Sequence, residues 1–324
     1  MLQYISMYNA PLLTALIATP IYVFLSFTTN ALGPWWQELT TPVEVVEPIT
    51  LAFVGDMMFD RYIRERAEAT SYDTILASVA PLLTVHDMVF GNLEGPITSF
   101  APVSDYRDTG PNHYRFTFAT TVAQTLAIAH FGAVTVGNNH ITNFGAEGVT
   151  QTKQWLAEAG IGHIGAPDEP YGAWRYATSG HNLAVYAYDP WHNKDMEALT
   201  NLISEEATST FVIVLAHWGE EYETEPTEYQ VERAHALVDA GADLIAGSHP
   251  HVIQSKERYK QAWIYYSLGN FIFDQYFSSD VRCGALLSLT LDERGIATTT
   301  EHFITLEKDG TTAPSTCMDT IPTL

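Results

Sequence analysis

The chain of 324 residues is long enough for one large domain or two modest ones, and 46% of its residues are hydrophobic, as expected for a globular protein with a buried core. With 38 Asp and Glu against 15 Lys and Arg, the formal net charge of −23 disfavours nucleic acid, anionic lipid headgroups and polyanionic substrates, unless a metal ion or a local basic region reverses the field. The two cysteines, Cys283 and Cys317, are too far apart for a cysteine metal motif, so either one disulfide or two free thiols fits the sequence.

The first 37 residues contain no charged side chain, and residues 11–27 are nearly all apolar. A membrane-spanning helix needs roughly 17–25 apolar residues, and tyrosines and tryptophans flank this run as they do at membrane interfaces. We therefore expect residues 1–32 to be an uncleaved membrane anchor and residues 33–48 to be a proline-containing linker. The domain that follows would then lie outside the cytoplasm. A buried or unstructured N-terminal segment is the alternative interpretation.

From residue 49 onward, apolar runs of strand length alternate with helical segments, which predicts an α/β fold. Two alternating runs joined by Asp-Glu-Arg-Gly predict a closing β-hairpin and a second sheet that is at least partly antiparallel. The folded domain is expected over residues 49–308, with a loose tail at 309–324. The expected strands are 49–54, 88–90, 133–136, 182–188, 211–216, 244–247, 262–267, 284–291 and 296–306, and the expected helices are 72–83, 120–131, 146–159, 194–207 and 228–240.

Polar side chains follow five of these apolar strands at the point where a turn begins. Any one of them alone is typical of a turn or a helix cap. Five together favour a shared site, because the strand ends of an open α/β sheet lie along one edge. Carboxylate, amide and imidazole groups without thiolates suit one or two divalent ions of Mn, Fe, Zn or Mg. The residues are Asp56, Asn92, Glu94, Asn138, Asn139, His140, His217, His249 and His251.

The segments Gly-Asp, Gly-Asn-Leu-Glu, Gly-Asn-Asn-His, His-Trp-Gly, Gly-Ser-His-Pro-His-Val and Ser-Leu-Gly-Asn-Phe occur in that order. Over residues 50–290 the chain thereby resembles the poly-γ-glutamate (CapA-type) capsule biosynthesis proteins, a branch of the calcineurin-like metallophosphoesterase superfamily. The resemblance implies a four-layer α-β-β-α sandwich with a metal site at the strand ends. It implies metal binding by Asp56, Asn138 or Asn139, His217, His249 and His251, proton donation to a leaving group by His140, and anion binding by Arg61 and, more loosely, Arg115.

Three positions depart from the family pattern. Met58 stands where the wider superfamily has a histidine, Asn92 where it has an aspartate between two metals, and Asn143 where the branch has an aspartate after His140. Glu94 is close enough in sequence to take the place of that aspartate. Two divalent ions about 4 Å apart repel by about 16 kcal/mol at an effective dielectric of 20, and a neutral asparagine offsets this poorly. We therefore expect one tightly bound metal ion and a second that is weak or absent.

Three functions fit these features. The first is a membrane-anchored, metal-dependent phosphoesterase-fold protein of capsule or poly-γ-glutamate synthesis or export, working beside other capsule-synthesis membrane proteins. The second is a free-standing phosphoesterase for a small phosphate ester. The third is a non-catalytic polymer-binding or export subunit with the same fold, which the residues Met58 and Asn92 favour. A hydrolase with a degenerate metal site, acting on a polymer or a phosphate ester, is the expected enzyme class.

Overall fold

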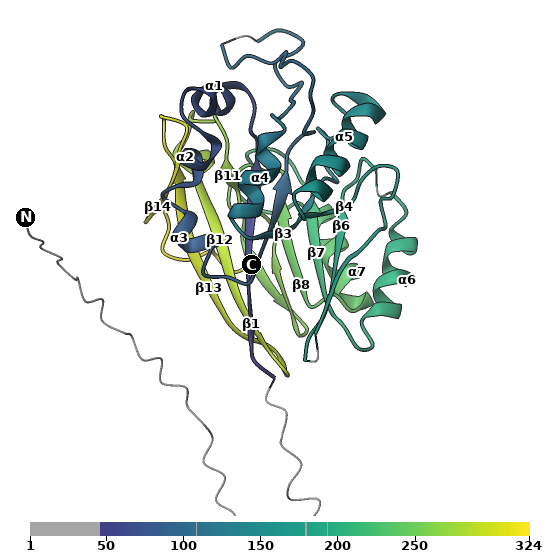
Figure 1. Ribbon diagram of the computed structural model, residues 1–324. Helices are drawn as coiled ribbons and strands as arrows, with labels where there is room; N and C mark the ends of the chain where they lie inside the picture. The colour runs from purple at the N-terminus through teal and green to yellow at the C-terminus, as the bar shows by residue number, and fades with distance from the viewer. Residues whose placement is uncertain (1–45, 108, 179, 193) are drawn as a thin grey trace, which may run out of the picture. The chain divides into compact units, whose positions relative to one another are not determined.

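The computed structural model describes residues 46–324 except 108, 179 and 193 (Figure 1). The expected anchor at 1–32 and nearly all of the expected linker at 33–48 lie outside these residues. Within the described part of the chain, no helix has both the length and the apolar character needed to cross a bilayer. Residues from Val46 to Leu324 form one folded unit.

The first sheet is built around β1 (Ile49–Met57), which is buried on both faces. On one side of β1 successive strands pair in parallel, and on the other side successive strands pair antiparallel. The parallel strands are β2 (Met88–Leu93), β3 (Phe131–Thr135) and β4 (Gly162–Ile164), and the short β11 (Asn270–Ile272) pairs with the end of β1. The antiparallel side holds β12 (Cys283–Asp292), β13 (Gly295–Leu306) and β14 (Thr312–Ser315). The predicted closing hairpin, formed by β12 and β13, is confirmed.

The second sheet has a parallel centre with an antiparallel strand at each edge. Its central strands are β6 (Asn182–Tyr188), β7 (Phe211–His217), β8 (Leu244–Ser248) and β10 (Ala262–Tyr265). The edge strands are β5 (Trp174–Ala177) and β9 (Lys256–Tyr259). The chain is thus mixed α/β with two sheets, as the alternating sequence pattern predicts.

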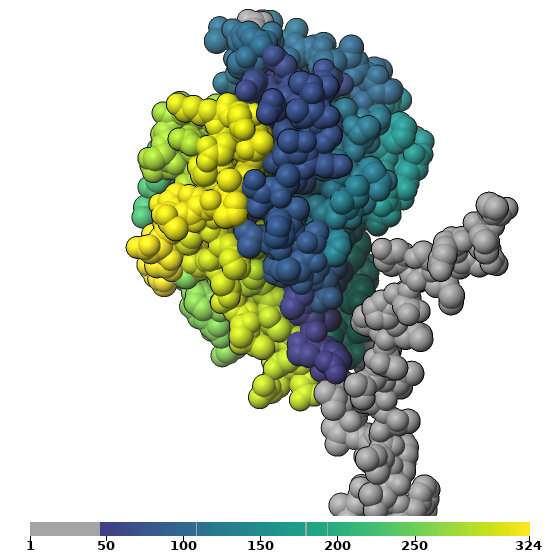
Figure 2. Space-filling view, turned by 60° about the vertical axis from the view of Figure 1, so that its left-hand side comes forward, coloured from purple at the N-terminus to yellow at the C-terminus, as the bar shows by residue number. Residues whose placement is uncertain are grey.

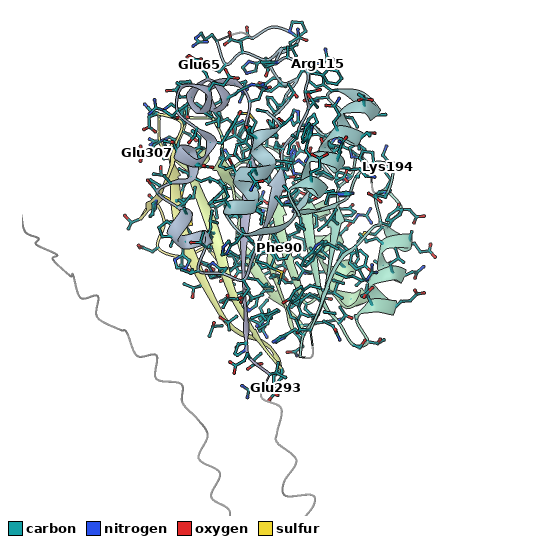
Figure 3. All side chains as sticks on the ribbon, in the orientation of Figure 1. Glu65, Phe90, Arg115, Lys194, Glu293 and Glu307 are labelled. Carbon is teal, nitrogen blue, oxygen red and sulfur yellow. A yellow bond between two sulfur atoms is a disulfide. The ribbon has the colours of Figure 1, made fainter. Side chains whose placement is uncertain are left out.

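The two sheets pack face to face, and helices cover their outer faces. Phe53 and Phe90 stack 5.4 Å apart in the core between the sheets, and Figure 3 shows Phe90 in the interior. The outer face of the first sheet packs against α1 (Arg61–Ala69), α2 (Tyr72–Leu76), α3 (Ala80–Leu83), α4 (Thr121–Ile128) and α5 (Gly145–Glu158). The outer face of the second sheet packs against α6 (Met196–Glu206) and α7 (Glu228–Ala240), while the short α8 (Ser279–Arg282) leads into β12. The order of layers is helix, sheet, sheet, helix.

The predicted helix at 228–240 has the predicted bounds because both of its ends are capped. Thr227 and Gln230 form a capping box at the start. At the end, Gly241 takes a left-handed conformation with φ 117°, which glycine adopts at little cost.

Three sequence predictions were wrong in detail. The residues expected as one helix at 72–83 form two, because Pro81 cannot continue the hydrogen-bond ladder of α2 and instead lies in the first turn of α3. The helix expected at 120–131 ends at Ile128, since His130 has φ 64° and the next strand follows at once. Helix α1 was not predicted, because its exposed face is rich in arginine and glutamate.

The segment expected as a loose tail at 309–324 is instead part of the fold. Strand β14 pairs with β13, and Pro314 is tolerated there because β14 is an edge strand. Ile321 is buried, and Cys317 forms a disulfide with Cys283 at the start of β12. In Figure 2 the yellow C-terminal segment lies directly against the blue surface of α1 to α3.

Candidate metal centre

Strand ends from both sheets meet at the predicted polar residues. Asp56 lies in β1, Asn92 in β2 and His217 at the end of β7, and His249 directly follows β8. The main-chain N–H of His249 donates a hydrogen bond to Asp56 Oδ2 at 3.0 Å, which links the two sheets. Beside this contact, Gly55 and Gly247 allow the connection between β10 and β11 to pass close to both strands, because a Cβ at either position would collide with its main chain.

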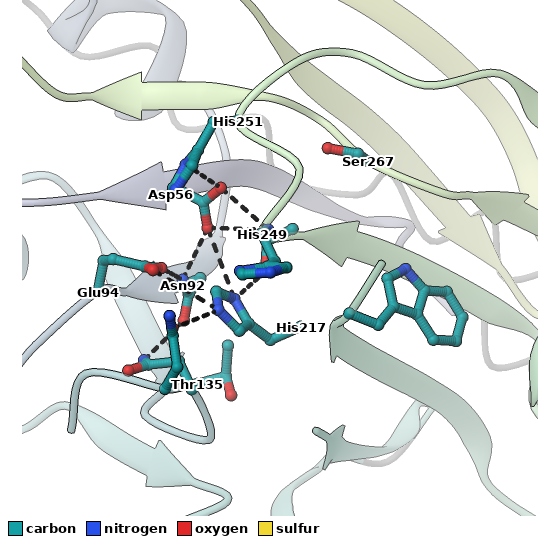
Figure 4. A network of polar contacts seen from close by, with 12 residues as sticks. Asp56, Asn92, Glu94, Thr135, His217, His249, His251 and Ser267 are labelled. Atoms are coloured by element: carbon teal, nitrogen blue, oxygen red, sulfur yellow. Dashed lines mark hydrogen bonds and ion pairs between the residues drawn. The ribbon is translucent and has the colours of Figure 1, made fainter. Parts of the chain in front are cut away.

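The structure brings the buried carboxylates and imidazoles of this site into direct contact, as Figure 4 shows. His251 Nδ1 lies 3.2 Å from Asp56 Oδ2. His217 lies between the two carboxylates, with Nδ1 3.7 Å from Asp56 Oδ1 and Nε2 3.6 Å from Glu94 Oε1. These side chains come from segments that are far apart in sequence, so the fold alone assembles them.

Glu94, His217 and His249 form a set that could hold one metal ion, because one ligand atom from each lies within 4.8 Å of the others. Glu94 Oε1 and His249 Nδ1 are buried, and neither has a hydrogen-bond partner among the described residues. A buried polar atom without a partner costs about 1–3 kcal/mol, and a cation between these atoms would satisfy both. This donor set of carboxylate oxygen and imidazole nitrogen fits a divalent transition metal ion.

Hydrogen bonds behind two histidines fix which ring nitrogen is free. Ser248 Oγ donates to a main-chain carbonyl, so it accepts the Nδ1–H of His217 at 3.0 Å. Asn270 Nδ2 donates to other acceptors, so its Oδ1 accepts the Nδ1–H of His251 at 3.0 Å. Each ring is therefore left with an unprotonated Nε2, and such outer partners commonly orient metal-binding histidines.

Asn139 is the better of the two predicted asparagine ligands. Its Oδ1 lies 3.1 Å from the unprotonated Nε2 of His217. Two ligands at ~2.1 Å from one ion lie about 3 Å apart, so the Asn139 side chain and His217 Nε2 have the spacing that two ligands of one ion would have.

Burial and charge set the protonation of the site. Burial lowers the pKa of His217 well below its usual value and that of His249 to about 4, so both rings are neutral ligands at physiological pH. Burial would raise the pKa of Asp56, but the hydrogen bond and charge of His251 hold it below its usual value. Burial and then the charge of Asp56 raise the pKa of Glu94 well above its usual value. A bound cation would reverse this and favour the ionised form of Glu94.

Asn92 and Asn138 have their amide groups engaged within the protein. Asn92 Nδ2 donates to Asp56 Oδ1 at 2.7 Å and also to Glu94 Oε2, so it bridges the two carboxylates. Its Oδ1 accepts from Asn138 Nδ2 at 3.0 Å. Asn138 Oδ1 in turn accepts two main-chain N–H groups, including that of His140. The structure places both residues at the site, and their roles as metal ligands stay predictions.

His140 lies beside the cluster with its ring held by Asn143. The main-chain N–H of Phe116 donates to Asn143 Oδ1 at 2.7 Å, which fixes the amide oxygen toward the His140 ring. His140 Nδ1, 3.2 Å from the same oxygen, therefore carries the proton, and Nε2 is an acceptor. Burial lowers the pKa of His140 to about 4. The predicted role of His140 as a proton donor requires that its Nε2 first gains a proton.

The two predicted anion-binding arginines lie in different surroundings. Arg61 is buried, forms an ion pair with Asp274 and contacts His113 Nε2 at 3.1 Å, so its charge is already compensated. Arg115 is exposed at the periphery, as Figure 3 shows, and its Nε donates to the carbonyl oxygen of Asn143. Neither arginine contacts the Glu94 set directly in the hydrogen bonds and ion pairs of the described residues.

Three residues of the site were not predicted. Asp274 pairs with Arg61, Asn270 orients His251, and Trp191 packs its ring 5.1 Å from that of His249. A fourth, Asp189, directly follows β6 and accepts the main-chain N–H of Trp191 at 2.9 Å. The signal was present, because Asp189 is again a polar residue directly after an apolar strand.

Comparisons with known proteins match the part of the chain that contains the site. The family model of the bacterial capsule synthesis protein PGA_cap matches residues 50–275, a range that includes the site from Asp56 to Asp274. The chain is 32% identical over 289 residues to the capsule biosynthesis protein CapA of Bacillus anthracis, covering 81% of this chain and 70% of that protein. It is 30% identical over 301 residues to the PGA biosynthesis protein CapA of Bacillus subtilis (strain 168), covering 86% of this chain and 77% of that protein. Among solved structures, the Thermus thermophilus sulfate thiohydrolase SoxB superposes with a TM-score of 0.47 and 14% identity over 82% of this chain and 56% of that chain, a likeness too distant to bear on the site.

Proposed function

Because the chain belongs to the family of bacterial capsule synthesis proteins, as its motifs predicted, we propose that it is a metal-dependent hydrolase that cleaves a phosphate ester during synthesis or export of a capsule polymer such as poly-γ-glutamate. The observation that carries this proposal is the pair of buried, unpartnered ligand atoms, Glu94 Oε1 and His249 Nδ1, facing the free Nε2 of His217. A carboxylate oxygen and imidazole nitrogens that lie this close together, with no partner for two of them among the described residues, suit a shared cation.

Several residues of the chain would take part in binding the metal ion. Glu94, His217, His249 and Asn139 would hold the ion, and the outer partner Ser248 keeps His217 in the correct tautomer. When bound, a divalent ion supplies Lewis acidity and lowers the pKa of a water molecule.

His140 would handle the proton at the reacting group. Its neutral form presents an unprotonated Nε2, so it would first accept the proton that the attacking water loses and then give it to the leaving oxygen as the phosphorus–oxygen bond of the ester breaks. Asn143, held by the Phe116 N–H, keeps the ring in position through both steps.

We further propose that the domain works outside the cytoplasm. The disulfide between Cys283 and Cys317 supports this location, since disulfides persist mainly in oxidising compartments. The relatives named for capsule and PGA biosynthesis are consistent with a protein of the cell envelope. The apolar run at residues 11–27 would anchor it to the membrane beside other capsule-synthesis proteins.

The test measures bound metal and turnover on the same preparations of the full chain. Wild-type protein should carry about one divalent ion per chain and hydrolyse bis(p-nitrophenyl) phosphate with added Mn²⁺. His249→Ala and Glu94→Gln should lose both properties. His163→Ala is the matched control. His163 lies on β4 and pairs with Glu169, and it has no hydrogen bond or ion pair to the site among the described residues. Wild-type protein without metal, or His249→Ala with normal turnover, would contradict the proposal.

A second candidate function is a non-catalytic polymer-binding or export subunit. Met58 favours it, because its buried sulfur accepts the Asp60 N–H at 3.0 Å where the superfamily pattern has a metal-binding histidine. Asn92 favours it too, since it neutralises the carboxylates by hydrogen bonds. Metal bound in the expected amount without turnover of any phosphate ester would support this function instead.

A further inference from the structure

Exposed aromatic side chains flank the histidine cluster on two sides. The ring of Trp191 lies 5.1 Å from that of His249 and 5.5 Å from that of His217. On the other side, the ring of Tyr222 lies 6.1 Å from that of His251 and packs at 5.1 Å against Phe277. Trp191, Tyr222 and Phe277 are 36%, 39% and 66% exposed, although each contacts the site or its neighbour. We call these three residues the aromatic rim.

The aromatic rim is held in place. Asp189 Oδ1 accepts the main-chain N–H of Trp191, which fixes the turn after β6. Tyr222 has φ 68°, a strained value for a tyrosine, and its N–H donates to the carbonyl of Pro250 at 2.8 Å. Its hydroxyl accepts from Gln275 Nε2 at 3.1 Å. Rings that are already ordered lose little entropy when a ligand stacks on them, so they suit a binding role.

The segment that carries Tyr222 is strongly acidic. Its sequence is Gly-Glu-Glu-Tyr-Glu-Thr-Glu, and Glu220, Glu221 and Glu223 are exposed and form no ion pair within the described residues. Inside the site, Asp56 and Glu94 would offset the positive charge of a bound divalent ion. Arg61 cannot compensate, because its charge is taken up by Asp274. Arg115, bound to the carbonyl of Asn143 beside His140, is a nearby cation with no carboxylate partner among the described residues.

Building on the proposed hydrolase function, we propose that the aromatic rim and the acidic segment together select the substrate. The site takes an ester that has a ring-bearing, largely apolar group and at most one negative charge. The ring stacks between Trp191 and Tyr222, and the single charge faces the metal ion and Arg115. A dianionic phosphate or a stretch of polyglutamate is disfavoured by Glu220, Glu221 and Glu223.

The test uses two ligands that cannot be hydrolysed and differ by one charge. Phenylphosphonate and its monomethyl ester are titrated by calorimetry into the Mn²⁺-loaded full chain, at a pH where the first is a dianion and the second a monoanion. Wild-type protein should bind the monoanion more tightly. The variant E220Q/E221Q/E223Q should narrow this preference about three- to tenfold at low salt, as expected for three charges within a Debye length of ~10 Å. Trp191→Ala should weaken the binding of both ligands several-fold.

The matched control is E158Q/E205Q/E293Q, which removes the same charge from exposed glutamates at the opposite end of the strands and should leave the preference unchanged. Tighter binding of the dianion by wild type, an equal effect of both triple variants, or binding of neither phosphonate would overturn the inference. Metal-loaded protein that shows the preference but hydrolyses no ester would uphold the inference and refute the proposed hydrolysis. Protein that binds no metal would refute the proposed function itself.

Discussion

Replacing Asn92 with aspartate tests the electrostatics of the site most directly. Asn92 Nδ2 donates to both Asp56 and Glu94, and all three side chains are buried. Asn92→Asp removes both hydrogen bonds and places a third carboxylate between the other two. It also restores the residue type that the superfamily has between its metals.

The expected cost can be worked out from these contacts. Two carboxylates about 4 Å apart repel by about 4 kcal/mol at an effective dielectric of 20, and the new carboxylate would face two neighbours. The metal-free Asn92→Asp variant avoids this repulsion by protonating one of the carboxylates. Protonating a carboxyl group with an ordinary pKa of about 4 at pH 7 costs about 4 kcal/mol. The metal-free variant should therefore lose about 4 kcal/mol in free energy of unfolding, a large part of the 5–15 kcal/mol that a typical domain has.

Metal should reverse the order of stability. An ion that binds only the native state stabilises it in proportion to its affinity, and a third carboxylate raises that affinity. In Mn²⁺ the Asn92→Asp variant should recover the free energy of unfolding that it loses without metal. Mn²⁺ should stabilise the variant more than it stabilises wild type, and the variant should bind a second ion. Urea unfolding followed by circular dichroism, with EDTA or with Mn²⁺, measures this, together with metal content. Asn182→Asp, at the exposed start of β6, is the control. Equal stability of Asn92→Asp and wild type in EDTA would refute the reasoning.

Three further changes test the frame around the site. Reduction of the Cys283–Cys317 disulfide, which spans 34 residues, should lower the free energy of unfolding by about 4 kcal/mol in urea titrations, and the double alanine variant should not respond to reductant. Asp274→Asn leaves its buried arginine partner without a counter-charge and should lower the free energy of unfolding by about 3–5 kcal/mol, whereas Asp292→Asn in the exposed hairpin turn should change it little; equal losses would count against the buried pair. Trp218→Phe removes a buried indole whose Nε1–H donates to a main-chain carbonyl at 2.9 Å, and should lower stability by about 2–4 kcal/mol, as thermal unfolding would show.

The sequence predicted the site well where local pattern and position agree. Each apolar run ends at a polar residue, and the two packed sheets bring these strand ends together, so Asp56, His217, His249 and His251 meet as expected. The same reasoning would have found Asp189, had the strand before it been considered with the others.

The sequence could not show which way the site residues point or which distant groups hold them. Nothing near Asn92 in the sequence indicates that its nitrogen, rather than its oxygen, faces the carboxylates. The partner of Arg61 lies 213 residues away, and only the paired strands bring Asp274 beside it. The C-terminal strand was missed for a similar reason, because a short segment with a proline gains its strand geometry from pairing with β13.

The loop that carries the paired histidines shows why the site and the fold cannot be separated. His249 has φ 95° and His251 has φ 59°, values that L-residues adopt at a cost of about 1–2 kcal/mol each. Such a backbone persists only when its surroundings fix it, and here Asp56 accepts the main-chain N–H of His249, while His251 Nδ1 lies 3.2 Å from the same carboxylate. The predicted metal-binding aspartate therefore also holds the backbone that presents two of the imidazoles. A substitution at Asp56 would disturb the positions of the histidines before it changed the charge of any bound ion, so loss of metal in such a variant could not be assigned to a lost ligand alone. Glu94 and His249, whose free atoms have no other role in the described structure, are the residues at which ligand loss can be measured cleanly.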